Sequence, residues 1–576
     1  MEQISIDKIK EILLERDDIE DILCFTNEEL FSKKYNCILE CKLLVYNIAV
    51  PILIGITNNW AIELFDFFIL KYGYNKSYGS ISNKLGYDDC KCFTDFIPHV
   101  EPLTGKMCLY ELEGILIDPC FSGLLNQCIE KAKTIIKNGI LKTDLASFIK
   151  EFNSYWDFSQ TLTEVNLCRP IDDTCILKYT KSNLDNTFVA AHETIEITFW
   201  TKPQTLYNAF YFKIQPDKSI YPPDMRSPLS IDFLNGLLKY VTHKQYKKVR
   251  NKISSPTILF FDFENPLPDS SSSVRICIGI YIHKGKLIEE NGIIRHINEA
   301  NISPIQVNPI EKTFLMQRTN TTANPLKMKK YLIIGCGSIG GYLCDLLVKS
   351  GCENITLVDN DNLQETNIFR HILGANYNNY PKTEALKLFM KSKIPNLNIQ
   401  DINHKIQTTV NNKIIDLDKY DYIFSVTGNQ NVNRWLEEFI DKHNIKTKII
   451  YGWNEPLDIG CHAVFVDTQK TGRLSSIFEK DPKNNCLFDK TAYTAPNQKV
   501  TIDNTGCGGS FIPYGSEVSI KTAIQCVNLL KQDIENLLDN NIIISEKGNG
   551  FYFKKAGLKL SEVYSNQDEL IKEINL

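Results

Sequence analysis

The chain of 576 residues lacks the features that mark several classes of protein. It has no excess of positive charge, since 64 basic and 69 acidic residues leave a formal net charge of −5, and we therefore expect no nucleic-acid partner. Its N-terminus lacks the basic region and apolar run of a secretory signal. The longest apolar stretch, residues 45–56, contains a proline and is too short to span a bilayer. We expect a cytoplasmic protein that does not act in a membrane.

Cysteine is abundant, but its spacing lacks the pattern of a zinc site. None of the 18 cysteines belongs to a Cys-x-x-Cys pair, so we expect no zinc. Disulfides are rare in cytoplasmic proteins, and most of these thiols should be small buried hydrophobic groups. A functional role for any one cysteine must therefore rest on the residues around it.

Three regions differ in pattern, and the length exceeds what one hydrophobic core supports. Residues 1–150 mix helical and strand-like segments. Residues 151–319 hold aromatic and β-branched runs between turn formers, which predicts a sheet-rich middle domain. In residues 320–576 strands and helices alternate, which predicts a parallel sheet with helices on both faces in a multidomain α/β protein. The predicted strands are 35–44, 49–56, 194–201, 209–214, 258–263, 274–283, 331–334, 354–358, 422–426 and 448–451, and amphipathic helices are predicted at 126–137 and 518–530.

A glycine turn, Gly335-Cys-Gly337-Ser-Ile-Gly340, follows an apolar strand and opens a helix. The first glycine permits a tight turn, the second lets a phosphate approach the backbone, and the third lets the helix pack close to the strand. Asp359 ends the next strand, where a carboxylate can hydrogen-bond a ribose. The turn predicts a nucleotide site, but by itself it does not separate ATP from the cofactor of a nicotinamide- or flavin-dependent dehydrogenase.

The polar segment after Asp359 favours ATP. It contains Asp361, Asn367 and Arg370, and Lys382 follows. Arginine and lysine can hold a triphosphate and neutralise the charge that develops on a phosphoryl group, and a second carboxylate can place a metal. A dehydrogenase would not require this combination of a second carboxylate, an amide, an arginine and a lysine.

The order and spacing of these residues resemble the ubiquitin-activating-enzyme family, over about residues 325–535. The family includes the ThiF-type adenylyltransferases that activate small carrier proteins. The resemblance implies a Rossmann-like, doubly wound adenylation domain that uses ATP and Mg²⁺. It implies that Asp359 binds the ribose and that Asp361 lies beside the metal. Asn367, Arg370 and Lys382 would contact phosphates.

Two further positions bear on this resemblance. Gly428 stands where the family usually has an aspartate that helps to bind magnesium, so metal binding should fall on Asp361 or be weaker. Members of the family commonly dimerise and lend an arginine to the neighbouring site. Arg318 stands where such an arginine would lie, and we expect a homodimer.

A thiolate can attack an acyl adenylate to form a thioester. Cys507 lies in a glycine-rich stretch before the predicted helix at 518–530. The family carries its reactive cysteine in a loop that crosses over the nucleotide just before such a helix, which implies that Cys507 is the nucleophile. Cys486 matches a position where some relatives keep half of a zinc pair, but its partner is missing here.

A second candidate cysteine, Cys108, lies shortly after the string His99-Val-Glu101. The arrangement resembles the active site of ubiquitin-conjugating enzymes, and it implies an α+β fold of that kind for residues 1–150 with Cys108 and His99 in catalysis. Glu101 stands where that family has the asparagine that stabilises the oxyanion, so another hydrogen-bond donor would be needed.

The two resemblances together imply a fusion of ubiquitin-conjugating-like and ubiquitin-activating-like domains, as in bacterial antiviral operons of the CBASS type. The string from Trp453 to His462 also fits that group, although no role is assigned to either residue. Such an enzyme would adenylate the C-terminus of a protein and pass it from Cys507 to Cys108 and then to a lysine amine. The protein would be a cGAS-like nucleotidyltransferase or a ubiquitin-like protein.

Three alternatives stay open. The adenylating domain could serve sulfur transfer or peptide modification, with residues 1–150 acting only as a binding module. A dehydrogenase is disfavoured by the phosphate-contacting residues. A catalytically inactive scaffold is favoured only by Gly428 and Glu101.

Overall fold

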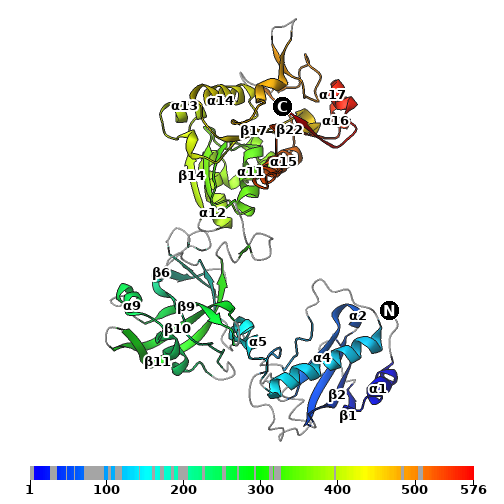
Figure 1. Ribbon diagram of the computed structural model, residues 1–576, viewed down its shortest axis with the longest axis vertical. Helices are drawn as coiled ribbons and strands as arrows, with labels where there is room; N and C mark the ends of the chain where they lie inside the picture. The colour runs from blue at the N-terminus through cyan, green and yellow to red at the C-terminus, as the bar shows by residue number, and fades with distance from the viewer. Residues whose placement is uncertain are drawn as a thin grey trace. The chain divides into compact units, whose positions relative to one another are not determined.

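The chain forms two units, Met1–Pro309 and Ile310–Leu576, each with its own hydrophobic cores (Figure 1). The computed structural model describes residues 5–25, 35–46, 48–57, 59–70, 97–101, 105–110, 120–141, 143–157, 163–168, 174–182, 187–192, 197, 201, 205–223, 228–249, 255–268, 271–290, 293–310, 315–316, 326–394, 397–481, 486–503 and 510–576. The further division of the first unit near residue 150 stays a prediction.

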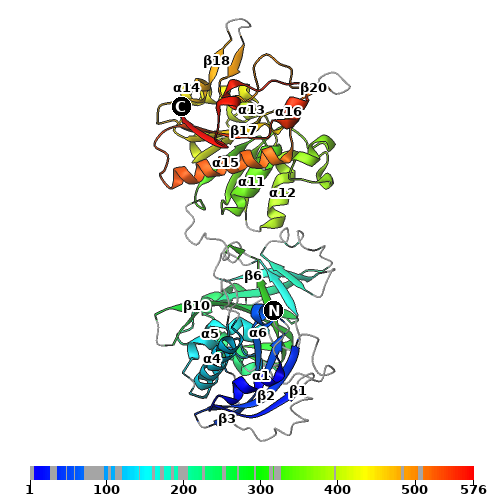
Figure 2. The same cartoon turned by 90° about the vertical axis from the view of Figure 1, so that its right-hand side faces the viewer.

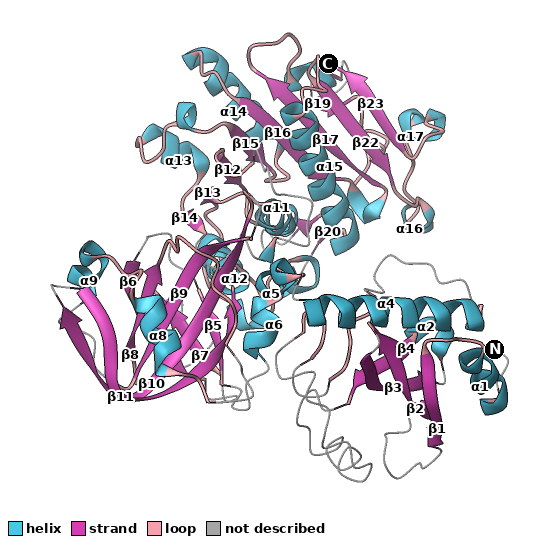
Figure 3. Ribbon diagram, turned by 60° about the horizontal axis from the view of Figure 1, so that its bottom comes forward, coloured by secondary structure: helices cyan, strands magenta, loops and turns pink. Residues whose placement is uncertain are grey.

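The first part of the N-terminal unit is an antiparallel sheet with a long helix against it (Figure 3). The strands lie in the order β1 (Ile19–Phe25), β2 (Tyr35–Val45), β3 (Ile48–Thr57) and β4 (Phe65–Ile69), and the helices are α1 (Ile6–Leu14), α2 (Trp60–Glu63) and α4 (Phe121–Leu141). Side chains three and four positions apart on α4 are buried together, as an amphipathic helix requires: Leu125, Cys128, Ile129, Ala132 and Ile136. The predicted strands and helix of this region are confirmed, whereas its assignment to the ubiquitin-conjugating fold stays a prediction.

The second part of this unit is a closed barrel, so the predicted sheet-rich region is confirmed. Its strands follow the order β10-β11-β5-β7-β6-β8-β9 around the barrel. They are β5 (Glu164–Leu167), β6 (Thr174–Lys181), β7 (Phe188–Ala191), β8 (Tyr207–Lys213), β9 (Thr257–Pro266), β10 (Ser273–Glu290) and β11 (Ile293–Pro309), with helices α5 (Leu145–Lys150), α6 (Phe152–Asp157), α8 (Ile231–Leu238) and α9 (His243–Val249). The predicted strand at 194–201 lies almost entirely outside the described residues, and β5, β6, β7 and β11 were not predicted.

The C-terminal unit is built on an eight-stranded sheet of order β14-β13-β12-β15-β16-β17-β22-β23. The first five strands are parallel, as predicted: β14 (Asn398–Ile402), β13 (Asn354–Val358), β12 (Lys330–Ile334), β15 (Tyr422–Ser425) and β16 (Lys448–Asn454). The predicted strands are thus parallel as expected, but three strands that were not predicted extend the sheet and are antiparallel to their neighbours: β17 (Gly460–Asp467), β22 (Ile542–Lys547) and β23 (Ile571–Asn575). Only five residues join β16 to β17, which suffices for an antiparallel return but not for a parallel crossover.

Helices cover both faces of this sheet, because alternate side chains of each strand point to opposite faces. On β12, Tyr331 and Ile333 pack in the core with α11 (Ser338–Lys349), α12 (Lys382–Lys393) and α15 (Ser516–Ile534). Helices α11 and α15 lie side by side (Figure 2). Leu332 and Ile334 pack in a second core with α13 (Ile406–Asn411) and α14 (Gln430–His443). Smaller elements of the unit are β18 (Phe478–Lys480), β19 (Leu487–Asp489), β20 (Ile502–Asp503), β21 (Ser510–Phe511), α16 (Phe551–Lys555) and α17 (Glu562–Asn566).

The strand order positions a crevice beside the first strand. β12 pairs with β13 on one side and with β15 on the other. The chain runs from β12 to β13 and β14 on the first side, and then returns to β15 on the second side. In open α/β sheets such a switch point opens a crevice at the carboxyl ends of the strands, where ligands bind.

Candidate functional site

The glycine turn lies between the end of β12 and the start of α11. Gly335 has a φ of +95°, which favours glycine. A methyl carbon on Gly340 would lie 1.9 Å from the Gly335 carbonyl oxygen, so the helix approaches the turn as closely as only glycine allows. Gly337 is the N-cap of α11, whose first amides are free to face an anion.

A cavity of about 590 Å³ opens over this turn, within the usual size of a small-molecule site. It is lined by residues that follow β12, β13, β14 and β15, and by Phe511, Ile512 and Tyr514 from further along the chain. Most of the predicted nucleotide-site residues line it: Gly335, Gly337, Asp359, Asp361, Asn367, Arg370, Lys382 and Gly428. Arg318 and Cys507 lie outside the described residues.

Asp359 ties the glycine turn to the next strand. Its Oδ2 accepts a hydrogen bond of 2.7 Å from the Cys336 amide, and its Oδ1 accepts one of 2.8 Å from the Asp361 amide. A carboxylate oxygen can accept a second hydrogen bond, so Asp359 retains the capacity to bind a ribose hydroxyl.

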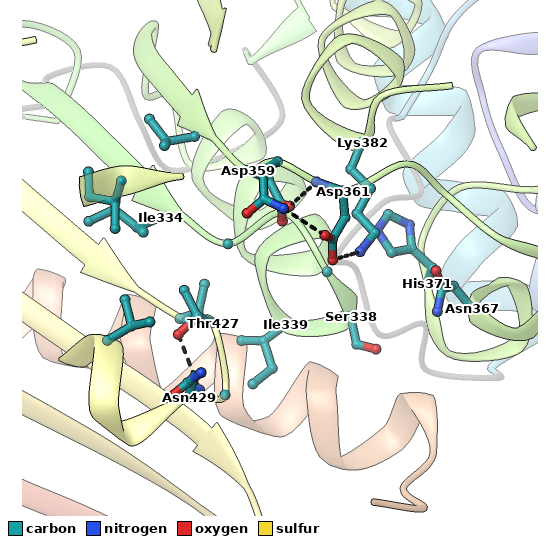
Figure 4. A pocket seen from close by; sticks show the side chains of 18 of the residues that line it. Ile334, Ser338, Ile339, Asp359, Asp361, Asn367, His371, Lys382, Thr427 and Asn429 are labelled. Carbon is teal, nitrogen blue, oxygen red and sulfur yellow. Dashed lines mark hydrogen bonds and ion pairs between the residues drawn. The ribbon is translucent and has the colours of Figure 1, made fainter. Parts of the chain in front are cut away.

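Lys382 and Asp361 form an ion pair inside the cavity (Figure 4). The lysine Nζ lies 3.0 Å from the aspartate Oδ2, and the Lys382 amide donates to the Asp361 carbonyl at the same distance. The lysine side chain is only 11% exposed and the aspartate 60%, so the ammonium is held from within while the carboxylate faces the opening. The pair presents a cation to phosphates and a carboxylate to a metal.

Arg370 and Asn367 come from a single 3-10 helix, η1 (Glu365–Arg370). Asn367 Oδ1 accepts from the Gln364 amide at 3.2 Å and thereby caps this helix. The Arg370 guanidinium lies over the Tyr514 ring, 4.8 Å from its centre. Tyr514 is a cavity residue that sequence reasoning missed, because it lies more than a hundred residues further along the chain.

His371 is a second residue that sequence reasoning missed, although it belongs to the polar segment. It is buried, its Nδ1 accepts from the Leu373 amide at 3.1 Å, and its Nε2 lies 2.8 Å from the Cys336 carbonyl oxygen. Since Nδ1 accepts, Nε2 carries the proton of a neutral imidazole and donates to that carbonyl. Burial lowers the pKa of His371 to about 4 and so favours this neutral form. His371 therefore holds the glycine turn in place through the Cys336 carbonyl.

Gly428 lies in the turn after β15 with a φ of +69°. A methyl group there would meet no atom within 4 Å, so the left-handed backbone is the constraint on this position. Asn429 caps the following helix α14 through its Oδ1, which accepts from the Asn431 amide at 3.0 Å. Within the described parts of the chain, no group of three or more His, Cys, Asp or Glu side chains is arranged to hold a metal ion. Mg²⁺ needs fewer, since it is commonly bound by one or two carboxylates together with phosphates.

The chain on both sides of Cys507 is paired. β20 and β21 run antiparallel, with Ile502 opposite Phe511 and Asp503 opposite Ser510. Phe511 and the next residue line the cavity. The connection that contains Cys507 therefore joins two paired strands, one of which includes the cavity residue Phe511.

The N-terminal unit brings Cys108 and His99 together. Cys108 is exposed, and its amide donates to the His99 carbonyl at 2.7 Å. His99 Nδ1 lies 2.5 Å from Oε1 of Glu151, and the His99 amide donates to Oε2 of the same carboxylate at 3.0 Å. The hydrogen bond that the His99 ring donates to Glu151 raises the pKa of His99, and the charge of Asp144, whose Oδ2 lies 3.8 Å from Nε2, raises it further. Neither acidic partner was predicted, because both lie far along the chain.

No helix in the described ranges has the length and apolar character that crossing a bilayer would require.

Comparison with known proteins places the C-terminal unit near adenylating enzymes. Residues 315–548 match the model of the ThiF family. A stretch of 289 residues is 26% identical to the ATP-dependent ubiquitin transferase-like protein Cap2 of Pseudomonas aeruginosa and covers 49% of each chain. A stretch of 263 residues is 26% identical to the protein of that name from Vibrio cholerae and covers 42% of each. A stretch of 128 residues is 30% identical to the molybdopterin-synthase adenylyltransferase of Haemophilus influenzae and covers 22% of this chain and 51% of that one.

The chain spans about half the length of these curated relatives. Among solved structures, Escherichia coli MccB with MccA-N7isoASN matches over 43% of this chain and 65% of that chain, with 19% identity and a TM-score of 0.30. The sequence-based resemblance to a fusion of the ubiquitin-activating type agrees with the names of the curated relatives.

Proposed function

We propose that the C-terminal unit, whose residues 315–548 match the model of the ThiF family, uses ATP to adenylate the C-terminal carboxylate of a protein. The observation that carries the proposal is the cavity at the switch point of the sheet. There the glycine turn, Arg370 and the Asp361–Lys382 pair meet. An anionic triphosphate beside a helix N-terminus and two cations fits this arrangement, and a dehydrogenase would not need it.

The reaction assigns a task to each group. A carboxylate oxygen attacks the α-phosphorus of ATP, the bond to the β-phosphate breaks, and pyrophosphate leaves. Arg370 and Lys382 stabilise the negative charge that builds up on the phosphates. Asp359 holds the ribose through its remaining lone pairs. Mg²⁺, carried by Asp361 and the phosphates, supplies charge neutralisation when bound.

Cys507 then takes the acyl group. Its thiolate attacks the carbonyl carbon of the acyl adenylate, and AMP leaves as the thioester forms. Support comes from the paired strands β20 and β21, which bring the flanks of this cysteine to the cavity wall.

The N-terminal unit would complete the transfer. Cys108 would take the acyl group from Cys507 by thiol exchange, and a lysine amine would attack this second thioester to form an isopeptide bond. The exposure of Cys108 and its backbone contact with His99 support this role. Similarity to the ATP-dependent ubiquitin transferase-like Cap2 proteins supports a conjugating function, which we place in CBASS signalling. We extend the proposal to a homodimer and to a cGAS-like nucleotidyltransferase or ubiquitin-like protein as the substrate.

A second candidate function has its own support. The similarity to a molybdopterin-synthase adenylyltransferase favours adenylation in a sulfur-carrier or peptide-modifying reaction. In that case residues 1–150 would bind a partner without forming a thioester.

Adducts trapped on the full-length chain distinguish these candidates. Purified protein is incubated with ATP, Mg²⁺ and one candidate protein substrate, and thiol-sensitive adducts are mapped by mass spectrometry. We expect ATP–pyrophosphate exchange in the wild type and in Cys507→Ala, whereas Cys507→Ala should lose the thioester formation and transfer that the wild type shows. The exposed cysteines Cys486 and Cys120 provide control alanine variants in the two units.

Cys108→Ala separates the two functions. The relay requires that this variant still forms the Cys507 thioester and fails to modify lysine. Normal transfer to lysine by Cys108→Ala would refute the relay, while absence of pyrophosphate exchange in the wild type would refute adenylation.

A further inference from the structure

The short turn between β16 and β17 contacts both ends of the segment that contains Cys507. The turn consists of Glu455 and the 3-10 helix η4 (Pro456–Asp458). It belongs to the string Trp453–His462, to which neither the sequence nor the proposed function gives a role. The segment in question runs from Tyr493 to Gly515.

Glu455 binds the first end of this segment. Its Oε1 accepts from the Tyr493 amide at 2.8 Å, and its Oε2 accepts from the Thr494 hydroxyl at 2.6 Å. The side chain is buried, with a residue exposure of 5%, and Nε2 of the fully buried His462 lies 3.1 Å from Oε1. A carboxylate taken out of water is retained where several donors satisfy it, as they do here.

The other end of the segment is bound by the next residues of the turn. The Leu457 amide donates to the Pro513 carbonyl at 2.7 Å. Oδ1 of Asp458 accepts from the Gly515 amide at the same distance, immediately before α15 begins. Two successive residues of the turn therefore hold the end of the segment that leads into α15.

The backbone of the turn is strained at the residues that make these contacts. Leu457 has a φ of +50° and Asp458 a φ of +59°. Side-chain-bearing residues rarely adopt this left-handed conformation, and it persists only where surrounding contacts enforce it. Such strain is concentrated at functional sites, which gives this turn an importance beyond joining two strands.

Between its two anchored ends the segment lines the nucleotide cavity. Phe511, Ile512 and Tyr514 are cavity residues, and Tyr514 carries the Arg370 guanidinium on its ring. We propose that the Glu455–Asp458 turn is a clasp that holds both ends of the segment 493–515 at the cavity. Glu455 and Asp458 are thus positioning residues for acyl transfer to Cys507, an inference that rests on the proposed function.

The energetic consequence follows from the geometry of attack. The Cys507 sulfur must reach the acyl carbonyl carbon of a bound adenylate, and a misplacement of about 1 Å lowers such a rate by up to about 100-fold. The paired strands β20 and β21 lie between the two anchors, so loosening one anchor lets this pair shift relative to the cavity. The glycine turn, Asp359 and the Asp361–Lys382 pair are not held by the anchors, whereas Tyr514, which carries Arg370 on its ring, lies next to one of them. Loosening an anchor is therefore expected to slow the attack more than it weakens nucleotide binding.

An electrophilic adenylate mimic tests the clasp without a protein substrate. In adenosine 5′-vinylsulfonamide a vinyl group stands near the place of the acyl carbonyl. The Cys507 thiolate adds to the terminal vinyl carbon, a proton goes to the neighbouring carbon, and no group leaves. On the full-length chain, the rate constant of trapping and the inhibition constant are measured separately, and the modified residue is identified by mass spectrometry.

Asp458→Gly removes the anchoring carboxylate and also relieves the left-handed strain, so a loss cannot come from added strain. We expect the trapping rate constant at saturating mimic to fall at least tenfold, and the inhibition constant to rise by less than that factor. Asp458→Asn keeps an acceptor for the Gly515 amide and tolerates the same backbone, and it should retain the wild-type rate. Asp539→Gly replaces an exposed aspartate elsewhere in the unit and should change neither constant.

Glu455→Gln tests the other anchor, with its melting temperature measured to confirm folding. It should slow trapping like Asp458→Gly. Wild-type trapping rates in both anchor variants would overturn the clasp. If the wild type binds ATP but the mimic never modifies Cys507, the nucleophile of the proposed function is wrong instead.

Discussion

Replacing Gly340 by alanine tests how closely the helix must approach the glycine turn. The added methyl carbon would lie 1.9 Å from the Gly335 carbonyl oxygen, whereas real Cβ atoms stay beyond 3.0 Å. Helix and turn must therefore separate by about 1.1 Å, the difference between these distances. The neighbour is backbone, which cannot rotate away as a side chain would.

Two effects of this separation can be estimated. Overpacking of this kind costs roughly 1–3 kcal/mol, which lowers the melting temperature of the C-terminal unit by roughly 2–12 °C. A shift of about 1 Å at the N-terminus of α11 also moves the amides that face the phosphates. We expect the rate of adenylation to fall by up to about 100-fold.

The assays are differential scanning calorimetry and ATP–pyrophosphate exchange, with two matched alanine variants. In Gly337→Ala the added methyl group has no atom within 4 Å, so this variant should melt like the wild type. Because Gly337 lines the cavity, the methyl group should still weaken ATP binding. Gly236→Ala, in the N-terminal unit, also meets no atom and should leave ATP binding unchanged. Wild-type melting and wild-type exchange in Gly340→Ala would show that the close approach is not required.

Three further predictions concern protonation and metal binding. His371→Leu should destabilise the unit by roughly 2–4 kcal/mol by leaving two buried partners unsatisfied, and His371→Gln, which keeps a donor and an acceptor, should recover part of that loss in calorimetry. The His99–Glu151 pair should be lost as pH rises through the raised pKa of His99, and also as pH falls through the depressed pKa of Glu151. Burial is the largest single effect on Glu151 and raises its pKa, but the hydrogen bonds and charge of His99, together with the Tyr155 hydroxyl, outweigh it. NMR of the labelled imidazole should show a midpoint above the ordinary 6.5 that Glu151→Gln lowers, and an unchanged midpoint would refute the pairing. Gly428→Asp should lower the Mg²⁺ concentration needed for ATP binding, and an equal effect of Gly428→Asn would show that charge is not the cause.

Much of the nucleotide site was predictable because its residues are close in sequence. The residues from Gly335 to Lys382 that line the site follow the ends of two successive β-strands, β12 and β13. These strands are parallel, so their carboxyl ends lie at one edge of the sheet. The residues that were missed act through distant partners. His371 was visible in the same segment, but its role depends on the Cys336 carbonyl above it. Tyr514 arrives from a segment whose path no local pattern reveals.

Local patterns also failed where pairing is long-range. Barrel closure depends on the parallel contact between β5 and β11, whose paired residues Glu164 and Gln306 lie far apart in the chain. The antiparallel half of the C-terminal sheet depends on the brevity of the turn after β16. Hydrophobic periodicity predicts that a strand exists, but it does not predict its neighbour.

By itself, the amino-acid sequence determined the glycine turn, the polar segment after it and the two candidate cysteines, since spacing along one or two elements suffices to define them. Tertiary structure alone decided the contact of buried His371 with the Cys336 carbonyl, the acidic partners of His99 and the clasp at Glu455 and Asp458. Each of these is a contact between groups distant in the chain, and its strength comes from burial and hydrogen-bond geometry that exist only once the fold has formed.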